Sequence, residues 1–190
     1  MYKKLLLYIS IFFIYILIGC STNKTDLNPT EKLINLEKIT VSETVYSIED
    51  FEKFGFKVSK SYKIKNLPSA NGAWYGFWIP PEENSNGEFV AFEIRSYPSH
   101  ELAVKDGKFF ADEVSGPKGK LKSSEVSWKE GTADRRKSGF NYGGGGAKLR
   151  PKYGSYIIYS NLVILCEGVD EEISMIRCKS LINKLINIEK

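Results

Sequence analysis

His100 is the only histidine in the 190-residue chain, so it is the first candidate for a catalytic base. A serine–histidine–acid triad would have to be assembled around it. Its neighbours Ser99 and Glu101 cannot supply that geometry from adjacent positions, and the chain contains no Gly-x-Ser-x-Gly elbow. The paired carboxylates Glu82–Glu83 and Glu171–Glu172 fall in a predicted turn and at a predicted helix start. We therefore identify no catalytic residue and expect a protein that is not an enzyme; a site assembled from residues far apart in sequence is the less favoured alternative.

Four consecutive glycines, Gly143 to Gly146, have the composition of a phosphate-binding loop. Such a loop must end in Gly-Lys-Ser or Gly-Lys-Thr, and here Ala147, Lys148 and Leu149 follow instead. The run is more typical of a surface loop, since glycine is the least restricted residue. Two thiols, Cys166 and Cys178, with only one histidine in the chain are a poor zinc-binding set. We accordingly expect no cofactor and no metal.

Basic residues are concentrated between Lys118 and Lys152. This segment holds ten lysines and arginines against three acids, a net charge of +7 in a chain whose formal charge is +4. Near a membrane, each such residue attracts anionic headgroups by about 1 kcal/mol. We take six of them as candidates for contact with an anionic lipid or polymer: Arg135, Arg136, Lys137, Lys148, Arg150 and Lys152. The alternative is an ordinary solvated face.

Trp74, Tyr75, Phe77 and Trp78 form a dense aromatic group. On a strand, Trp74 and Trp78 would share one face and the other two the opposite face. Two exposed tryptophans could stack on a sugar or contact a protein partner. Burial in the core is the commoner role of such residues.

The N-terminus has the pattern of a secretory signal. Lys3 and Lys4 precede an apolar run from Leu5 to Ile18, which is shorter than the roughly 20 residues a membrane-spanning helix needs. The run ends in Leu17, Ile18, Gly19 and Cys20. This sequence resembles the lipobox of bacterial lipoproteins, and the resemblance covers only the first 20 residues.

The resemblance implies that the Cys20 thiol receives a diacylglyceryl group and that the chain is cut before Cys20, whose new amine is then usually acylated. Several acyl chains give stable anchoring, because each buried CH₂ contributes about 0.8 kcal/mol. The protein would then be held on a membrane, facing away from the cytoplasm. The alternative is an uncleaved N-terminal anchor helix with an incidental cysteine.

If Cys20 carries lipid, Cys166 and Cys178 form an even pair. In an oxidising exported compartment such a pair is typical of a disulfide. Their spacing is not the Cys-x-x-Cys of a redox centre. We expect a structural disulfide, with two buried free thiols as the alternative. Removing the signal peptide also removes two lysines and lowers the net charge to +2, which does not favour nucleic-acid binding.

Hydrophobic periodicity predicts an α+β domain at 39–190, after a signal peptide at 1–19 and a lipidated, polar tether at 20–38. We expect a short helix capped by Ser47, a longer helix after Ser99 and a final helix after Asp170. Strands are predicted at residues 56–64, 73–79, 88–97, 120–128, 156–159 and 162–166, and residues 132–153 are predicted to be loop-like.

The order of these elements predicts two hairpin-then-helix units, 73–114 and 155–188, in an antiparallel sheet with helices on one face. The sequence thus favours a membrane-anchored, extracytoplasmic binding or interaction module. Its expected partners are the membrane, through the lipid, and an envelope protein, polymer or anionic lipid. A structural accessory of an envelope assembly is the second interpretation.

Overall fold

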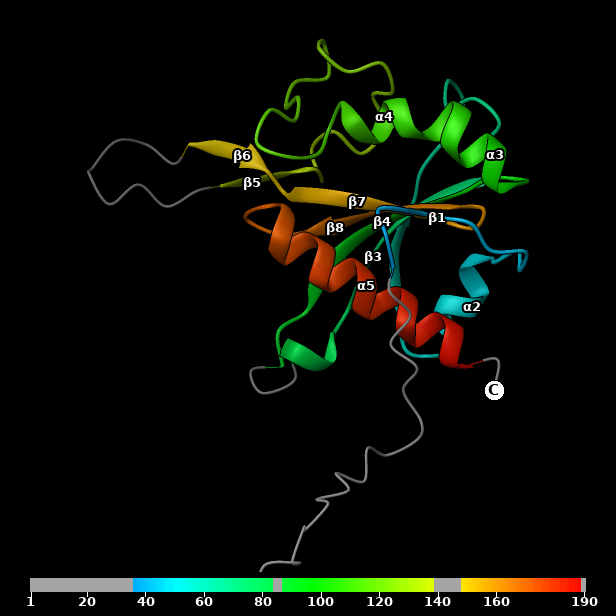
Figure 1. The fold of residues 1–190 in the computed structure, drawn as a ribbon. Helices are drawn as coiled ribbons and strands as arrows, with labels where there is room; N and C mark the ends of the chain where they lie inside the picture. Colours follow the sequence, from blue (N-terminus) through cyan, green and yellow to red (C-terminus); the bar gives the residue numbers. More distant parts are fainter. Residues whose placement is uncertain (1–35, 84–86, 139–147, 189–190) are drawn as a thin grey trace, which may run out of the picture. The chain divides into compact units, whose positions relative to one another are not determined.

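The computed structural model describes residues 36–83, 87–138 and 148–188. A six-stranded sheet with the order β1-β7-β8-β4-β3-β2 forms its centre (Figure 1). Every neighbouring pair in this sheet is antiparallel except β1 and β7, which are parallel. The strands are β1 (Ile39–Thr40), β2 (Lys57–Ser61), β3 (Gly72–Trp78), β4 (Val90–Ser96), β7 (Tyr153–Tyr159) and β8 (Leu162–Glu167). A separate two-stranded ribbon pairs β5 (Arg136–Ser138) with β6 (Leu149–Pro151).

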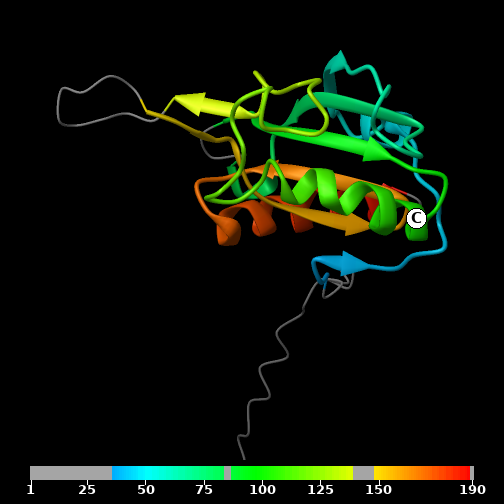
Figure 2. The same ribbon diagram turned by 90° about the horizontal axis from the view of Figure 1, so that it is seen from above.

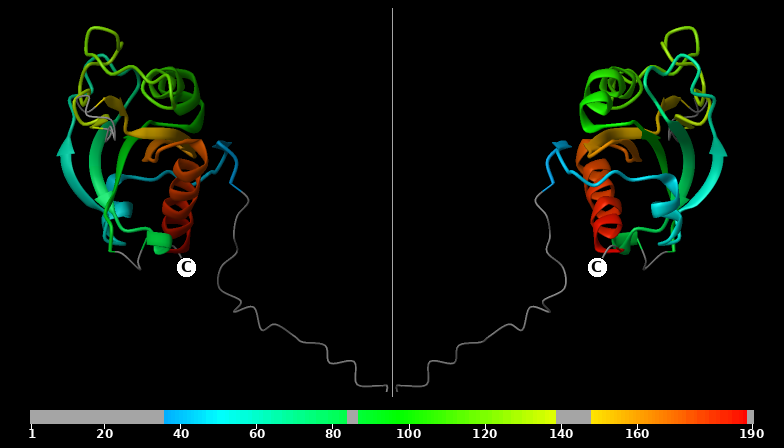
Figure 3. Two further views of the ribbon diagram at one scale, coloured as in Figure 1. Left: turned by 90° about the vertical axis from the view of Figure 1, so that its left-hand side faces the viewer. Right: turned by 90° about the vertical axis from the view of Figure 1, so that its right-hand side faces the viewer.

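Helices cover both faces of the sheet (Figures 1 and 3). On one face α5 (Glu171–Ile188) and α2 (Ile48–Glu52) enclose a core with Phe92, Ile94 and Ile164. The opposite face is covered by one continuous helical segment, seen in front of the sheet in Figure 2. It consists of α3 (His100–Leu102), the π-helical turn η2 (Ala103–Gly107) and α4 (Lys108–Asp112). A short 3-10 turn, η1 (Pro81–Glu83), lies between β3 and β4.

The central strands are buried because both of their faces are covered. In β8, Ile164 and Cys166 belong to the α5 core, whereas Val163 and Leu165 belong to the core under α3 and α4. This alternation follows from the two-residue period of a strand. Because both faces are covered, β4 and β7 are buried along their whole length.

Gly107 allows the helical segment to lie close to the sheet. A β-carbon at this position would lie 2.7 Å from the ring of Tyr97 and 2.8 Å from Val163. The π-helical turn ends at Gly107, and the Tyr97 ring occupies the space that a side chain at position 107 would need. Glycine is therefore required here by packing, although it lowers intrinsic helix propensity.

The predicted α+β class is confirmed, and so is the order of two hairpins, each followed by a helix. Ser99 caps its helix through the Leu102 amide, and Ser47 donates its amide to Asp50 as expected for a capping box. The expectation of helices on one face is wrong, because the first unit's helix covers the face opposite to α5. The parallel β1 also makes the sheet mixed.

Three local predictions are wrong. Residues 120–128 form turns instead of a strand, and residues 132–153, expected to be loop, contain β5 and β6. Leu36, placed in the tether, is buried in the core, so the folded domain begins before residue 39. The signal peptide, Cys20 and the glycine run lie outside the described residues.

Candidate functional site

Two charged side chains lie on the face of β4 that points away from α5. Alternation along the strand directs Phe92 and Ile94 toward α5, and it places Glu93 and Arg95 on the opposite face. Both side chains are fully buried. The register of β4 with β3 pairs Glu93 with Tyr75. A buried charge must find a partner, so the contacts of Glu93 decide how this face is built.

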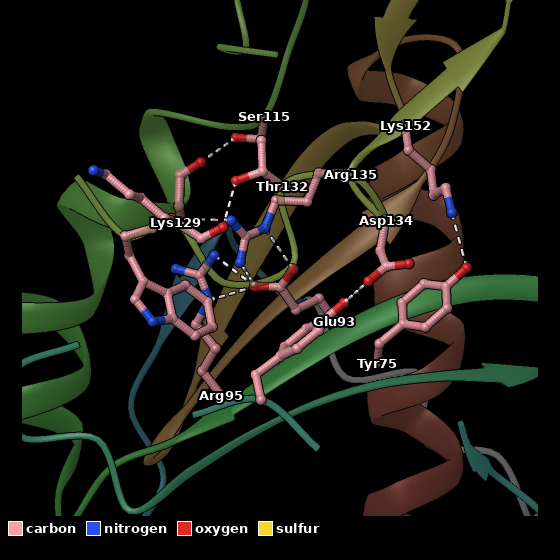
Figure 4. Close-up of polar contacts among 12 residues, drawn as sticks. Tyr75, Glu93, Arg95, Ser115, Lys129, Thr132, Asp134, Arg135 and Lys152 are labelled. Carbon is pink, nitrogen blue, oxygen red and sulfur yellow. Dashed lines mark hydrogen bonds and ion pairs between the residues drawn. The ribbon is translucent and has the colours of Figure 1, made fainter. Parts of the chain in front are cut away.

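Glu93 binds two arginines at once (Figure 4). Arg95 donates from Nε to Oε1 at 2.8 Å, and its Nη2 lies 2.7 Å from the same oxygen. Arg135 donates from Nε to Oε2 at 2.7 Å and from Nη2 to Oε1 at 3.0 Å. Burial alone would raise the pKa of Glu93, but the two guanidinium groups hold it below its usual value.

The ring of Trp128 contacts both guanidinium groups. Its ring centre lies 5.0 Å from Cζ of Arg95 and 4.6 Å from Cζ of Arg135, within cation–π range. The indole N–H donates to the carbonyl oxygen of Lys63, and Arg135 donates to the carbonyl oxygen of Trp128. We call Glu93, Arg95, Trp128 and Arg135 the latch, because they fasten the segment 113–138 to the sheet.

The position of Arg135 in the latch corrects one prediction made for the basic segment. Arg135 is only 1% exposed and pairs with Glu93, so it does not contribute to a contact on the protein surface. Its neighbour Arg136 is half-buried at the start of β5. Three consecutive basic residues thus have different environments, which their sequence does not distinguish.

A second polar group surrounds Tyr75 at the edge of the latch (Figure 4). Asp134 accepts hydrogen bonds from Lys60 at 2.5 Å and from Tyr62 at 2.9 Å. Lys152 donates to the hydroxyl of Tyr75 at 2.8 Å. Partial burial lowers the pKa of Lys152 and raises that of Tyr75 to about 12. Tyr75 therefore stays protonated at neutral pH and is a poor general base.

Lys137 also has a partner within the protein, because it forms an ion pair with Glu167. The Glu167 carboxylate also accepts a hydrogen bond from the amide of Ala91. Of the six basic candidates, Arg135, Lys137 and Lys152 thus bind groups of the protein itself. Lys148 and Arg150 remain, together with half-buried Arg136.

Lys148 and Arg150 line an open hollow on the outer surface. Its volume is about 530 Å³, and a third cation, Lys118, completes the basic part of its lining. The other described lining residues are Pro117, Gly119, Leu121, Leu149 and Pro151, so none of the described residues of the lining is acidic. We call this feature the basic hollow.

Trp74 and Trp78 lie on the face of β3 that packs in the α5 core. Trp78 is 7% exposed and packs against Phe54 and Phe92. Trp74 is half-buried against the same core. The prediction that both share one face is confirmed, but the proposed ligand contact is wrong for Trp78 because the core covers it.

His100 and the cysteine pair have structural contacts. The Nδ1 atom of His100 lies 2.8 Å from the carbonyl oxygen of Ser160 at the β7–β8 turn. Cys166 and Cys178 form a disulfide that joins β8 to α5, as expected. In the described ranges, no group of three or more His, Cys, Asp or Glu residues could hold a metal ion. None of the described helices is long and apolar enough to cross a membrane.

The latch was not predicted from the sequence, and Lys118 was not among the six basic candidates. A signal for the latch was present, because Glu93 and Arg95 stand two residues apart within the apolar alternation of β4. Charges on the face of a central strand require buried partners. The identity of those partners depends on contacts spanning 42 residues of sequence, such as that of Glu93 with Arg135.

The chain belongs to DUF6810, a family of unknown function, which it matches over residues 47–187. This range includes the whole latch and every residue that lines the basic hollow. The chain matches no curated protein and no solved structure.

Proposed function

We propose that this protein is an extracytoplasmic lipoprotein, anchored through Cys20, whose folded domain is a non-enzymatic module that binds an anionic partner at the membrane surface. The address is supported by the signal pattern and the lipobox-like Leu17-Ile18-Gly19-Cys20. The Cys166–Cys178 disulfide supports export, because such bonds persist in oxidising compartments.

The basic hollow carries the binding part of the proposal. Three cations line one open surface, and in the described part of the chain none of them forms an ion pair. By contrast, Lys120, Lys122 and Lys137 nearby all pair with glutamates. Uncompensated positive charge gathered in one hollow favours a negatively charged ligand.

The electrostatics of the remaining polar groups support binding over catalysis. The carboxylate of Glu93 is buried between two arginines and is closed to a substrate. The Asp134 carboxylate is engaged by Lys60 and Tyr62. Burial raises the pKa values of the Tyr62 and Tyr75 hydroxyls, so both stay protonated at neutral pH and are poor nucleophiles.

The anchor is tested by the intact mass of protein purified from membranes of its native host. We expect the mass of residues 20–190 plus acyl chains, and loss of the added mass in Cys20→Ala. Alkylation of Cys166 and Cys178 only after reduction would agree with the disulfide. A mass that retains residues 1–19 without lipid would refute the lipid anchor.

A structural accessory of an envelope assembly is the second candidate function. Ile173 and Ile176 of α5 are exposed at 37% and 51%, with the i, i+3 spacing of one helix face, and Val169 just before the helix is 65% exposed. A photo-crosslinker at position 176 would test this face in the native host, with one at the exposed position 184 as control. A discrete crosslinked protein from position 176 alone would favour the accessory role, and equal products from both would count against it.

A further inference from the structure

The basic hollow is built from a tight turn packed on the end of a strand. Gly119 donates its amide to the Gly116 carbonyl, closing a turn in which Pro117 and Lys118 are the central residues. Proline is favoured at the first of these two positions. The Gly116 amide in turn bonds to the carbonyl of Tyr153, which fixes the turn beside β6 and β7.

Gly119 permits this close approach. A β-carbon here would lie 2.9 Å from the Val114 backbone and 3.1 Å from Pro151. The turn therefore rests directly on the residue that ends β6. Lys118 in this turn lines the hollow together with Lys148 and Arg150.

The shape and lining of the hollow fit an extended surface better than a small molecule. Small-molecule sites enclose most of their ligand, whereas this hollow is open. Leu149 stands between Lys148 and Arg150 in the chain and is 46% exposed. Cations beside an exposed apolar side chain match the boundary between phosphate headgroups and acyl chains.

We propose that the basic hollow contacts anionic phosphate headgroups of the bilayer that holds the lipid anchor. This inference rests on the proposed function, because it takes the bilayer to be the one in which Cys20 is anchored. The segment between Cys20 and Leu36 spans at most about 55 Å in any conformation, so the domain stays within reach of that surface. Membrane contact then needs only weak attraction by the hollow.

The expected strength follows from the number of cations. Each Lys or Arg near an anionic surface changes membrane partitioning by about fivefold, and three together by about a hundredfold. Screening reduces the effect as salt is added. The binding must therefore depend on both lipid charge and ionic strength.

The test uses unlipidated residues 21–190, which contain all described core residues from Leu36 to Leu185. Co-sedimentation is measured with vesicles of phosphatidylcholine, with and without about one-third phosphatidylglycerol. The hollow variant is K118Q/K148Q/R150Q. The matched control, K65Q/K105Q/K184Q, removes three exposed lysines elsewhere that form no ion pair within the described ranges.

We expect the wild-type chain to bind the anionic vesicles, the hollow variant to lose about a hundredfold in partitioning, and the control to change by less than threefold. Thermal melts establish that all three chains are folded equally well. Equal losses in both variants would refute the hollow as the contact site. Failure of the wild-type chain to bind, or hollow-dependent binding to soluble polyphosphate but not to vesicles, would refute the bilayer as partner. The mass of the native protein tests the anchor independently of these outcomes.

Discussion

At the scale of single residues, the fate of each charge depends on whether it meets a partner inside the protein. Glu93 and Arg135 are buried together, while Lys148 and Arg150 lie on the basic hollow. Removing one member of a buried ion pair costs more than the pair contributes, because the other charge is left uncompensated. The latch should therefore be the most sensitive polar group of the domain.

Glu93→Gln should lower the free energy of unfolding by about 3–5 kcal/mol, because Arg95 and Arg135 would remain buried without their carboxylate. Urea denaturation followed by tryptophan fluorescence measures this change. Glu130→Gln is the matched control, since Glu130 is exposed, and it should change stability by less than about 0.5 kcal/mol. Similar effects of both substitutions would show that the latch does not stabilise the fold.

The stability of the domain should fall in acid. The pKa of Glu93 is held below its usual value by the two arginines, so its contribution is complete at neutral pH and is lost as the pH falls through the folded-state pKa. The carboxyl pKa of Asp134 is also lowered, against the effect of its partial burial, by Lys60 and Tyr62. Melting temperatures should thus change little between pH 7 and about pH 5 and decrease below about pH 4. A melting temperature that rises on acidification would contradict this assignment.

At the scale of elements, the two hairpin-then-helix units place their helices on opposite faces of one sheet. The second helix, α5, is joined to β8 through Cys166 and Cys178. The first has no such crosslink in the described residues and instead packs closely, at Gly107, on Tyr97 and on Val163 of β8. The two helices are therefore fixed by different means, one covalent and one by close packing.

Replacing both Cys166 and Cys178 with Ser should lower the free energy of unfolding by about 2–3 kcal/mol, since the bond closes a short loop. Chemical denaturation of the double variant beside reduced wild type checks the value. Reduced wild type should resemble the double variant. Unchanged stability in both would mean that the contacts of α5 with the sheet suffice without the bond.

At the scale of the whole domain, burial is greatest in the middle of the sheet. β4 and β7 are buried along their entire length, and β8 for all but its last residue. The edge strand β2 is largely exposed. Stability is consequently expected to be highest where helices cover both faces and to decrease toward the edges.

Hydrogen exchange should reveal this gradient. Amides of β4 and β8 should exchange most slowly, near the rate set by global unfolding, and those of β2 and β5 much faster. Exchange followed by mass spectrometry over hours measures the difference. Equal protection of β2 and β4 would contradict a stability maximum at the centre.

The sequence alone determined the α+β class, both principal hairpins, the helix caps and the pairing of Cys166 with Cys178, because these depend on local periodicity, on capping chemistry or on the count of cysteines. Only the tertiary structure decided that helices lie on both faces and that Trp78 is core. It also separated buried Arg135 from Arg150, which lines the basic hollow, although both belong to one basic segment. The physical reason is that burial and charge pairing join residues such as Glu93 and Arg135 that are distant in the chain, and no local pattern specifies which of them will meet.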